Sequence, residues 1–303
     1  MFIAPADPGE AVLAGAALNV LLGPGMVVDV ACAEPALPLF RATPGLRSIR
    51  ALGGAGFRGW LRLARDAAEE RYDLVLDLSR GRLGYAVRAD RRIVRGSPRV
   101  LRHLLEEFAA LVGAERLAPH IWLDEKARAD AAATVSLGGP MLAIALGGAG
   151  WPAERFAAAA RRLVSGAGPL SGAEVVVLGD SGAADAARTI TLSLDADGVS
   201  ARNLAGRLDI VAAGAALERV TLCLASDPAL MHVAASVGAP TLALFGASDE
   251  RIMGPYGPRT RALRGRTYED VMSGAAPGDG LDALSVDTVE QAALDLLHAG
   301  GLR

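Results

Sequence analysis

The stretch from Leu222 to Ala247, LCLASDPALMHVAASVGAPTLALFGA, constrains the fold of this chain more than any other. It reads as a strand, a tight loop, a short helix and a second strand. The apolar run Thr221–Leu224 is too short for a helix, so it predicts a buried strand. Asp227 suits the N-cap of a helix, and Pro228 suits the first helical position, where its missing N–H costs nothing. The helix is expected to run to Gly238, a residue that suits the turn after a helix.

This stretch predicts a helix N-terminus at the carboxyl edge of a parallel sheet. The second strand is expected from Thr241 to Phe245, and Gly246 ends it. The apolar residues spaced to face the sheet from the helix are Leu230, Val233, Ala234 and Val237. Free N–H groups in the first turn of such a helix favour an anion. The sequence therefore predicts an α/β protein with an anion site at this edge.

Length, charge and the placement of cysteines, histidines and apolar residues exclude several classes of protein. A chain of 303 residues suits two domains of ordinary size, and a formal net charge of -3 gives no reason to expect nucleic acid. Cys32 and Cys223 lie in apolar surroundings, which indicates free thiols in a reducing cytosol. The histidines show no metal-ligand spacing. We read no signal peptide and no apolar run of the roughly 20 residues that a membrane helix needs, so a cytoplasmic protein without a transmembrane segment is expected.

The central stretch and its flanks resemble the donor-binding region of glycosyltransferase family 9, the ADP-heptose:lipopolysaccharide heptosyltransferases. The chain follows the family pattern D-S-G-x-x-H-x-A-A-x-x-G-x-P except at its second and third places. The matching residues are Asp227, His232, Ala234, Ala235, Gly238, Pro240, Phe245 and Gly246, then Gly254-Pro255-Tyr256-Gly257, and upstream Asn203-Leu204-Ala205-Gly206. The resemblance implies the GT-B fold, in which two doubly wound (Rossmann-like) α/β domains face a cleft. It also implies inverting, metal-independent transfer of a heptose-like sugar from a nucleotide sugar such as ADP-heptose.

The resemblance implies a division of the chain into three parts. Residues 1–122 would form an N-terminal acceptor-side domain, and residues 123–285 a C-terminal nucleotide-sugar-binding domain. The stretch Ala118–Lys126 looks like the crossing between them. Residues 286–303 would contain a final amphipathic helix that packs back on the N-terminal domain.

The candidate catalytic residue is Glu10. Family 9 proteins have a Gly-Asp pair in the first loop, whose Asp is thought to act as general base, and Gly9-Glu10 stands in that place. A carboxylate at a helix start can take a proton from an acceptor hydroxyl, although the extra methylene of Glu10 changes its reach. The alternative is that Glu10 only interacts favourably with the helix dipole.

The resemblance implies a donor site made by the Gly147–Gly150 loop and by the helix that begins after Asp227. The residues expected to bind the donor are Gly147, Gly148, Arg155, Asp227, Pro228, Ala229 and His232. Ala149 and Gly150 stand where the family has a phosphate-gripping lysine. Arg155 is the nearest cationic substitute, and it also suits an ordinary surface position.

A second departure concerns the start of the central helix. Pro228-Ala229 replaces the Ser-Gly pair of the family, and this removes a hydroxyl and an N–H group from the expected phosphate site. His232 keeps the family spacing from Asp227, and it either lines a cleft or is solvated.

A basic block extends from Arg80 to Arg102. Its eight arginines occur with one acid, Asp90, within an acidic chain; they are Arg80, Arg82, Arg88, Arg91, Arg92, Arg95, Arg99 and Arg102. Such a block suggests a surface for an anionic partner. The resemblance implies an anionic glycolipid or saccharide acceptor, bound by Arg80, Arg82 and Arg88, and it allows peripheral contact with the inner membrane. The alternative is a solvated face in an arginine-rich chain.

Two other functions stay open. The missing lysine and Ser-Gly pair also fit a non-catalytic relative that binds a sugar or nucleotide, or that supports a partner enzyme. Gly54, Gly56 and Gly59 fit the dinucleotide-binding pattern G-x-G-x-x-G, but no firm strand precedes them, so a flexible loop is the better interpretation than an NAD site.

Overall fold

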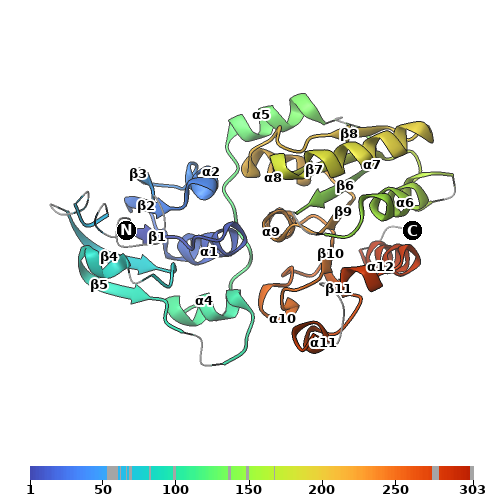
Figure 1. Cartoon of the computed structure of the whole chain (residues 1–303). Helices are drawn as coiled ribbons and strands as arrows, with labels where there is room; N and C mark the ends of the chain where they lie inside the picture. Colours follow the sequence, from blue (N-terminus) through green and yellow to red (C-terminus); the bar gives the residue numbers. More distant parts are fainter. Residues whose placement is uncertain are drawn as a thin grey trace. The chain divides into compact units, whose positions relative to one another are not determined.

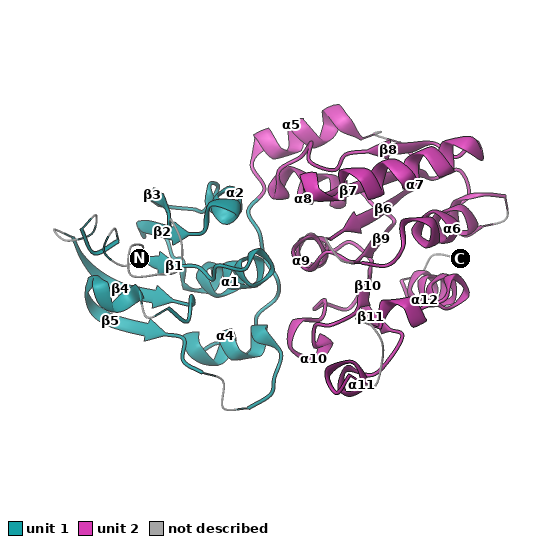
Figure 2. Cartoon of the chain, viewed as in Figure 1, with its two compact units in different colours: residues 1–122 teal, residues 123–303 magenta. Residues whose placement is uncertain are grey.

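The computed structural model describes residues 1–52, 61, 63–65, 67, 70–81, 83–97, 100–135, 138–147, 150–166, 168–274 and 280–300. The chain divides into two compact units, Met1–Trp122 and Leu123–Arg303 (Figure 2). The sequence placed the domain boundary between residues 122 and 123 as well. The G-x-G-x-x-G segment at residues 54–59 lies outside the described residues.

The first unit is built on a parallel sheet whose described strands have the order β3-β2-β1-β4-β5 (Figure 1). The strands are β1 Phe2–Ile3, β2 Val28–Cys32, β3 Leu46–Ala51, β4 Arg71–Asp77 and β5 Arg88–Val94. The described helices are α1 Pro8–Leu21, α2 Leu37–Phe40 and α4 Leu104–Val112, with 3-10 turns at Glu34–Ala36 and Leu83–Ala86.

Helix α1 already contains Glu10, the residue that stands at the place of the family's first loop. The side chain of Asp7 accepts a hydrogen bond from the Glu10 N–H at 2.8 Å, and Pro8 occupies the first helical position. Glu10 therefore lies in the first helical turn and not in the preceding loop. Farther along, a Cβ on Gly15 would lie 2.7 Å from the carbonyl oxygen of His120, so only glycine lets α1 approach that segment.

The second unit contains a parallel sheet whose described strands have the order β11-β10-β9-β6-β7-β8. The strands are β6 Met141–Leu146, β7 Glu174–Gly179, β8 Ala201–Asn203, β9 Leu222–Ala225, β10 Thr241–Phe245 and β11 Thr260–Arg264. The helices are α5 Glu125–Thr134, α6 Ala153–Val164, α7 Ala184–Ala196, α8 Ile210–Leu217, α9 Pro228–Ser236, α10 Glu250–Met253, α11 Tyr268–Met272 and α12 Val286–Ala299, with 3-10 turns at Ser181–Ala183 and Leu281–Ala283.

The predicted strand–helix–strand unit is confirmed as β9, α9 and β10. Asp227 caps α9, because its Oδ1 accepts a hydrogen bond from the Leu230 N–H at 2.7 Å. Val233 and Ala234 are fully buried, as their helical spacing predicts. The helix ends at Ser236, before Gly238, whose φ of +76° lies in the left-handed region.

The final helix has its packing partners within the second unit. The apolar face of α12, including Val289, Ala293 and Leu297, is buried in one core with Phe156 and Leu163 of α6. This core accounts for the amphipathic pattern of the helix, and its expected contact with the N-terminal domain stays a prediction. No helix in the described part of the chain combines the length and the apolar character needed to cross a membrane.

Candidate active site

Each sheet reverses its direction of winding at one point. In the first sheet the reversal lies at β1, which pairs with β2 on one side and β4 on the other. In the second sheet it lies between β6 and β9. Ligands of doubly wound sheets bind at such switch points, outside the carboxyl ends of the strands. The residues that follow β1, β4, β6 and β9 are therefore the first candidates for a site.

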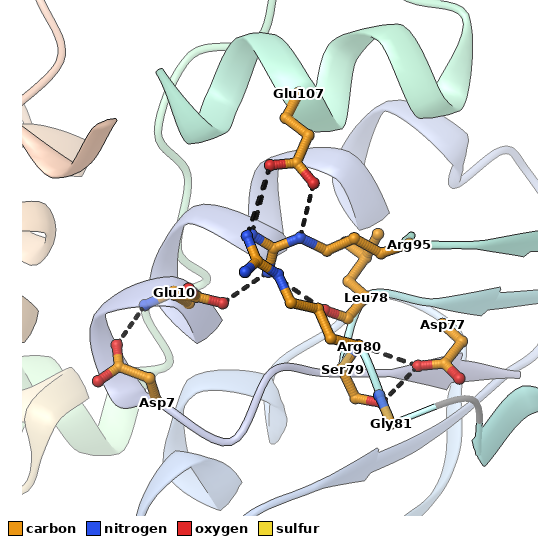
Figure 3. Close-up of polar contacts among 9 residues, drawn as sticks. All are labelled: Asp7, Glu10, Asp77, Leu78, Ser79, Arg80, Gly81, Arg95 and Glu107. Atoms are coloured by element: carbon orange, nitrogen blue, oxygen red, sulfur yellow. Dashed lines mark hydrogen bonds and ion pairs between the residues drawn. The ribbon is translucent and has the colours of Figure 1, made fainter. Parts of the chain in front are cut away.

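At the first switch point a group of charged side chains meets, which we name the Arg95 cluster: Glu10, Arg95 and Glu107 (Figure 3). Glu10 follows β1, Arg95 follows β5 directly, and Glu107 lies on α4. The Arg95 Nη1 atom donates to Glu10 Oε2 at 2.6 Å, and Nε donates to Glu107 Oε1 at 2.8 Å. The cation thus joins two carboxylates from different helices.

The buried member of this cluster is the cation. The Arg95 side chain is 1% exposed, whereas those of Glu10 and Glu107 are 26% and 16% exposed. The guanidinium carbon lies 5.0 Å from the centre of the Phe108 ring. Its Nη1 also lies 3.5 Å from the Leu78 carbonyl oxygen. A buried charge is stable only when it is paired and hydrogen-bonded, and these contacts meet that requirement.

The loop after β4 is folded around the buried carboxylate of Asp77. Asp77 accepts hydrogen bonds from the Ser79 N–H at 2.9 Å, the Ser79 hydroxyl at 2.6 Å and the Gly84 N–H at 2.7 Å. Within this loop Arg80 has a φ of +59°, and no other non-glycine residue in the described ranges has a positive φ. Such a conformation costs roughly 1–2 kcal/mol and points to a position that the surroundings enforce. Arg80 Nη2 lies 3.8 Å from Glu107 Oε2, at the margin of the Arg95 cluster.

The structure divides the expected acceptor-binding arginines. Arg80 lies beside the Arg95 cluster, but Arg88 is exposed at the amino end of β5. Strand β5, from Arg88 to Val94, spans about 20 Å at ~3.3 Å per residue. Arg88 at its amino end and Arg80 at the carboxyl edge therefore lie at opposite ends of the sheet. Arg82 lies outside the described residues. Arg95, which the sequence assigned to a basic surface, is buried, so the basic block is not one face.

At the second switch point the two expected donor loops meet. Gly147 follows β6, and its N–H donates to the Ser226 hydroxyl at 3.4 Å. A Cβ on Gly147 would lie 3.1 Å from Asp227 Cα and from the Ser226 carbonyl oxygen, and one on Gly150 would lie 3.1 Å from Ser226 Oγ. Glycine therefore lets the main chain at Gly147 approach that of Ser226 and Asp227, and lets Gly150 approach the Ser226 side chain. Gly148 lies outside the described residues.

The start of α9 completes this edge. Pro228 is exposed at the first helical position, and Ala229 beside it is half-buried. The proline offers no N–H, so the turn presents one backbone donor fewer than the Ser-Gly pair of the family pattern would. His232 is fully buried, which removes the solvated alternative for this residue.

Arg155 forms hydrogen bonds to the segment that precedes α12. Its Nη1 donates to the carbonyl oxygens of Asp282 at 2.7 Å and Leu284 at 2.9 Å. The indole N–H of Trp151 donates to the same Leu284 oxygen at 2.9 Å. These bonds give Arg155 a structural role at the start of α12, and its contact with a donor phosphate stays a prediction.

A second arginine–carboxylate group lies at the opposite, amino end of the first sheet. The buried carboxylate of Asp29 accepts hydrogen bonds from Arg47 Nε at 3.0 Å, the Ser48 hydroxyl at 2.7 Å and the Tyr72 hydroxyl at 2.6 Å. Burial alone raises the pKa of Asp29, but the hydrogen bonds from Arg47, Tyr72 and Ser48 outweigh it and hold the pKa well below its usual range. Burial and the neighbouring Asp29 carboxylate raise the pKa of Tyr72 to about 12.

Sequence reasoning missed three members of the first site: Asp77 as the centre of its loop, Arg95 and Glu107. No local sequence signal marked Arg95, because β5 lacks the apolar alternation of a strand; only the structure shows that Arg95 follows β5 at the same edge as the residues after β1 and β4. Among the described residues, no three His, Cys, Asp or Glu side chains form a group that could hold a metal ion.

Comparison with known sequences matches more than half of this chain to one family. Residues 79–273 match glycosyltransferase family 9 (heptosyltransferase). Lipopolysaccharide heptosyltransferase 2 of Escherichia coli K12 is 29% identical over 151 residues, and that of Salmonella typhimurium LT2 is 28% identical over the same length. Each alignment covers 49% of this chain but only 42% of the relative, less than two thirds of its length.

Solved structures resemble the whole chain. The glycosyl transferase family 9 structure from Veillonella parvula has a TM-score of 0.77 at 21% identity and covers 98% of this chain and 96% of its own. Heptosyltransferase WaaC of E. coli, solved with ADP, has a TM-score of 0.69 at 13% identity and covers 97% and 98%. At these identities the likeness concerns the fold. The predicted fold class, GT-B with two doubly wound α/β units, is confirmed.

Proposed function

The chain belongs to glycosyltransferase family 9, and we propose that it transfers a heptose-like sugar from a nucleotide sugar to an anionic saccharide or lipopolysaccharide-core acceptor. One observation supports this most: a carboxylate lies at the switch point of one sheet, and a glycine–helix junction lies at that of the other. The first supplies a base, and the second supplies main-chain donors for a diphosphate. The nucleotide sugar is a substrate in this proposal, and no metal cofactor takes part.

The proposed reaction is a single displacement with inversion. The acceptor hydroxyl oxygen attacks the anomeric carbon of the donor sugar and forms the new glycosidic bond. The bond from that carbon to the phosphate oxygen breaks, and its electron pair leaves with the nucleoside diphosphate. The hydroxyl proton passes to Glu10, whose backbone is held by Asp7 at 2.8 Å.

The second switch point suits the leaving group. The departing diphosphate gains negative charge, which the N-terminus of α9 and the main chain at Gly147 stabilise. The solved relative WaaC contains ADP, which supports an ADP-sugar as the donor here as well. On the acceptor side, Arg80 is 46% exposed beside Glu107, so its guanidinium is accessible to a phosphate or carboxylate of the acceptor.

A second function is a non-catalytic one. Pro228-Ala229 in place of Ser-Gly, and Ala149-Gly150 in place of the family lysine, favour a protein that binds a sugar or nucleotide without transfer, or that supports a partner enzyme.

One experiment separates the two functions. The purified chain is screened against a panel of nucleotide sugars by thermal shift, and any stabilising donor is then offered with a lipopolysaccharide-core acceptor. A ligand that binds only the native state raises the unfolding temperature, by ~2.7 kcal/mol of stability at 100 times its Kd. We expect ADP-heptose to stabilise the chain and its heptose to be transferred. Stabilisation without transfer would support the non-catalytic function, and no response to any nucleotide sugar would contradict the proposed transfer.

A further inference from the structure

We propose that Arg95 is the residue that positions Glu10 for proton transfer, and that Glu107 holds Arg95 in place for this task. The inference rests on the proposed role of Glu10 as the base. It concerns a side chain that acts through Glu10, since the burial of Arg95 at 1% exposure keeps its guanidinium from reaching an acceptor directly.

The position of the Arg95 guanidinium is fixed without any help from Glu10. The Arg95 N–H donates to the Asp77 carbonyl oxygen at 2.8 Å, which continues the pairing of β5 with β4. Glu107 accepts from Nε at 2.8 Å and lies 3.4 Å from Nη2, so two nitrogens of the fork face one carboxylate. Phe108 lies against the guanidinium at 5.0 Å. A planar fork held in this way keeps Nη1 in one direction, toward Glu10.

Glu10 is the member of the cluster that solvent reaches most. Its side chain is 26% exposed, against 16% for Glu107 and 1% for Arg95. The bond to Arg95 uses Oε2 at 2.6 Å. A carboxylate offers about four lone-pair sites, so Oε1 of Glu10 is the atom that can accept the proton of the acceptor hydroxyl. Figure 3 shows Glu10 extended from the start of α1 toward the guanidinium.

The charges of the cluster fit this division of tasks. Glu10 and Glu107 each carry one negative charge, and Arg95 is the buried cation. Arg80 is a second cation, whose Nη2 lies 3.8 Å from Glu107 Oε2. Glu107 neutralises the buried cation, and Glu10 therefore stays available as an anion that can be protonated.

The test is a double-mutant cycle on transfer, with ADP-heptose as donor and single-turnover detection for the slow variants. Arg95→Gln should lower kcat by about 10- to 100-fold, because a misplacement of ~1 Å can cost about 100-fold. The KM for the donor should not change. In the Glu10→Gln background the same substitution should change kcat by less than about twofold, because a positioning residue has nothing left to position. Arg95→Lys should restore part of the loss, because it keeps the charge without the planar fork.

The pH profile gives a readout that a purely structural role would not move. Arg95→Gln removes a cation from beside the base, so the acidic limb of kcat/KM should move to higher pH. Glu107→Gln removes an anion from the same cluster and leaves the arginine in place, so the limb should move to lower pH. If Arg95→Gln fails to fold, Glu107→Gln alone still carries the test through the direction of its shift.

Arg47→Gln is the matched control, because it breaks the Arg47–Asp29 pair of the same unit at the other end of the sheet. It should lower the unfolding temperature and leave the acidic limb unmoved. A wild-type chain without transfer activity would overturn the proposed function itself. An active wild type in which Arg95→Gln costs as much in the Glu10→Gln background as on its own, or in which neither substitution moves the acidic limb, would overturn this inference alone.

Discussion

The carboxyl edges of the two sheets hold different kinds of chemistry. At the edge of the first sheet the Arg95 cluster brings together charged side chains from three elements. At the edge of the second sheet Gly147, Ser226 and the start of α9 bring together main chain, with one capping carboxylate. Side-chain charges respond to pH and to neighbouring charges, whereas backbone donors do neither.

We expect the side-chain edge of the first sheet to control the rate of transfer and the backbone edge of the second sheet to control donor affinity. A substitution at the first edge should change the rate of transfer and its dependence on pH, with little effect on donor affinity. A substitution at the second edge should change donor affinity, with little effect on the pH profile. The following variants test that separation, from the largest expected effect on transfer to the smallest.

Glu10→Gln should lower kcat by about 100- to 10,000-fold, the range that a general base contributes. Gln is nearly isosteric and still accepts a hydrogen bond from Arg95, so the unfolding temperature should change little. Calorimetry with ADP should give the same affinity as the wild type. Surviving turnover would make Asp7 the next candidate base, and a loss of ADP binding would remove the separation between the two edges.

Pro228→Ser with Ala229→Gly should tighten the binding of ADP. The double substitution restores one N–H and one hydroxyl at the start of α9, and a hydrogen bond to a charged group contributes about 1.5–3 kcal/mol, or roughly ten- to a hundredfold in affinity. Glycine in the first turn costs at most about 1 kcal/mol of helix stability. Calorimetry measures the gain.

The control for this pair is Asp227→Ala, which removes the cap of α9 and should cost about 1 kcal/mol of stability. If the double variant folds and its affinity for ADP is unchanged, the diphosphate binds elsewhere or this chain does not use a nucleotide sugar.

Gly147→Ala should weaken ADP binding by about tenfold. The new methyl group would lie 3.1 Å from Asp227 Cα, so the residues after β6 and the start of α9 must move apart by a small fraction of an ångström. A loss of one charged hydrogen bond corresponds to about 1.5 kcal/mol, which is this factor. Gly138→Ala is the control, since a Cβ there meets nothing within 4 Å. Equal affinities in the two variants would show that the close approach at Gly147 has no part in binding.

Asp29→Asn should leave transfer unchanged and lower the stability at neutral pH, with a difference from the wild type that becomes smaller in acid. The pKa of Asp29 is lowered in the folded chain, so its contribution to stability is fully present above the ordinary Asp pKa of about 3.9 and is lost as the pH falls below that value. Thermal unfolding between pH 7 and pH 3 should therefore show a smaller decrease for the Asp29→Asn variant than for the wild type. A change in the acidic limb of kcat/KM would mean that this end of the sheet also reaches the active site.

The parts of the molecule that could be predicted from sequence are those with a local signal. The β9–α9–β10 unit is marked by Asp227, Pro228 and Gly238, each of which has a conformational reason to stand where it does. Glu10 was chosen through the family resemblance, because Gly9-Glu10 stands where the family has its Gly-Asp pair. For Arg95 no such pattern exists: β5 reads RADRRIV, without the alternation of apolar residues that marks a strand.

The Arg95–Glu10 bond joins residues 85 positions apart, which no local rule connects. The basic block was therefore interpreted from composition as one surface. In the structure Arg88 and Arg95 lie at opposite ends of β5, because an extended chain advances about 3.3 Å per residue. Arg95 is in addition buried. The family resemblance pointed to the loops after β6 and β9 as the donor site, which stays a prediction, and it could not reveal that Arg155 binds the segment before α12.

That last contact links distant parts of the second unit mechanically. Trp151, the neighbour of Gly150, and Arg155 share the Leu284 carbonyl oxygen as an anchor, although Trp151 and Leu284 are 133 positions apart. The start of α6 is therefore tied to the segment that precedes α12. A proteolytic nick at that segment, or a fusion partner that pulls on α12, would be transmitted through this anchor toward Gly150 and Ser226. We therefore expect substitutions in the segment before α12 to change the geometry of the glycine–helix junction, although none of its own residues is altered.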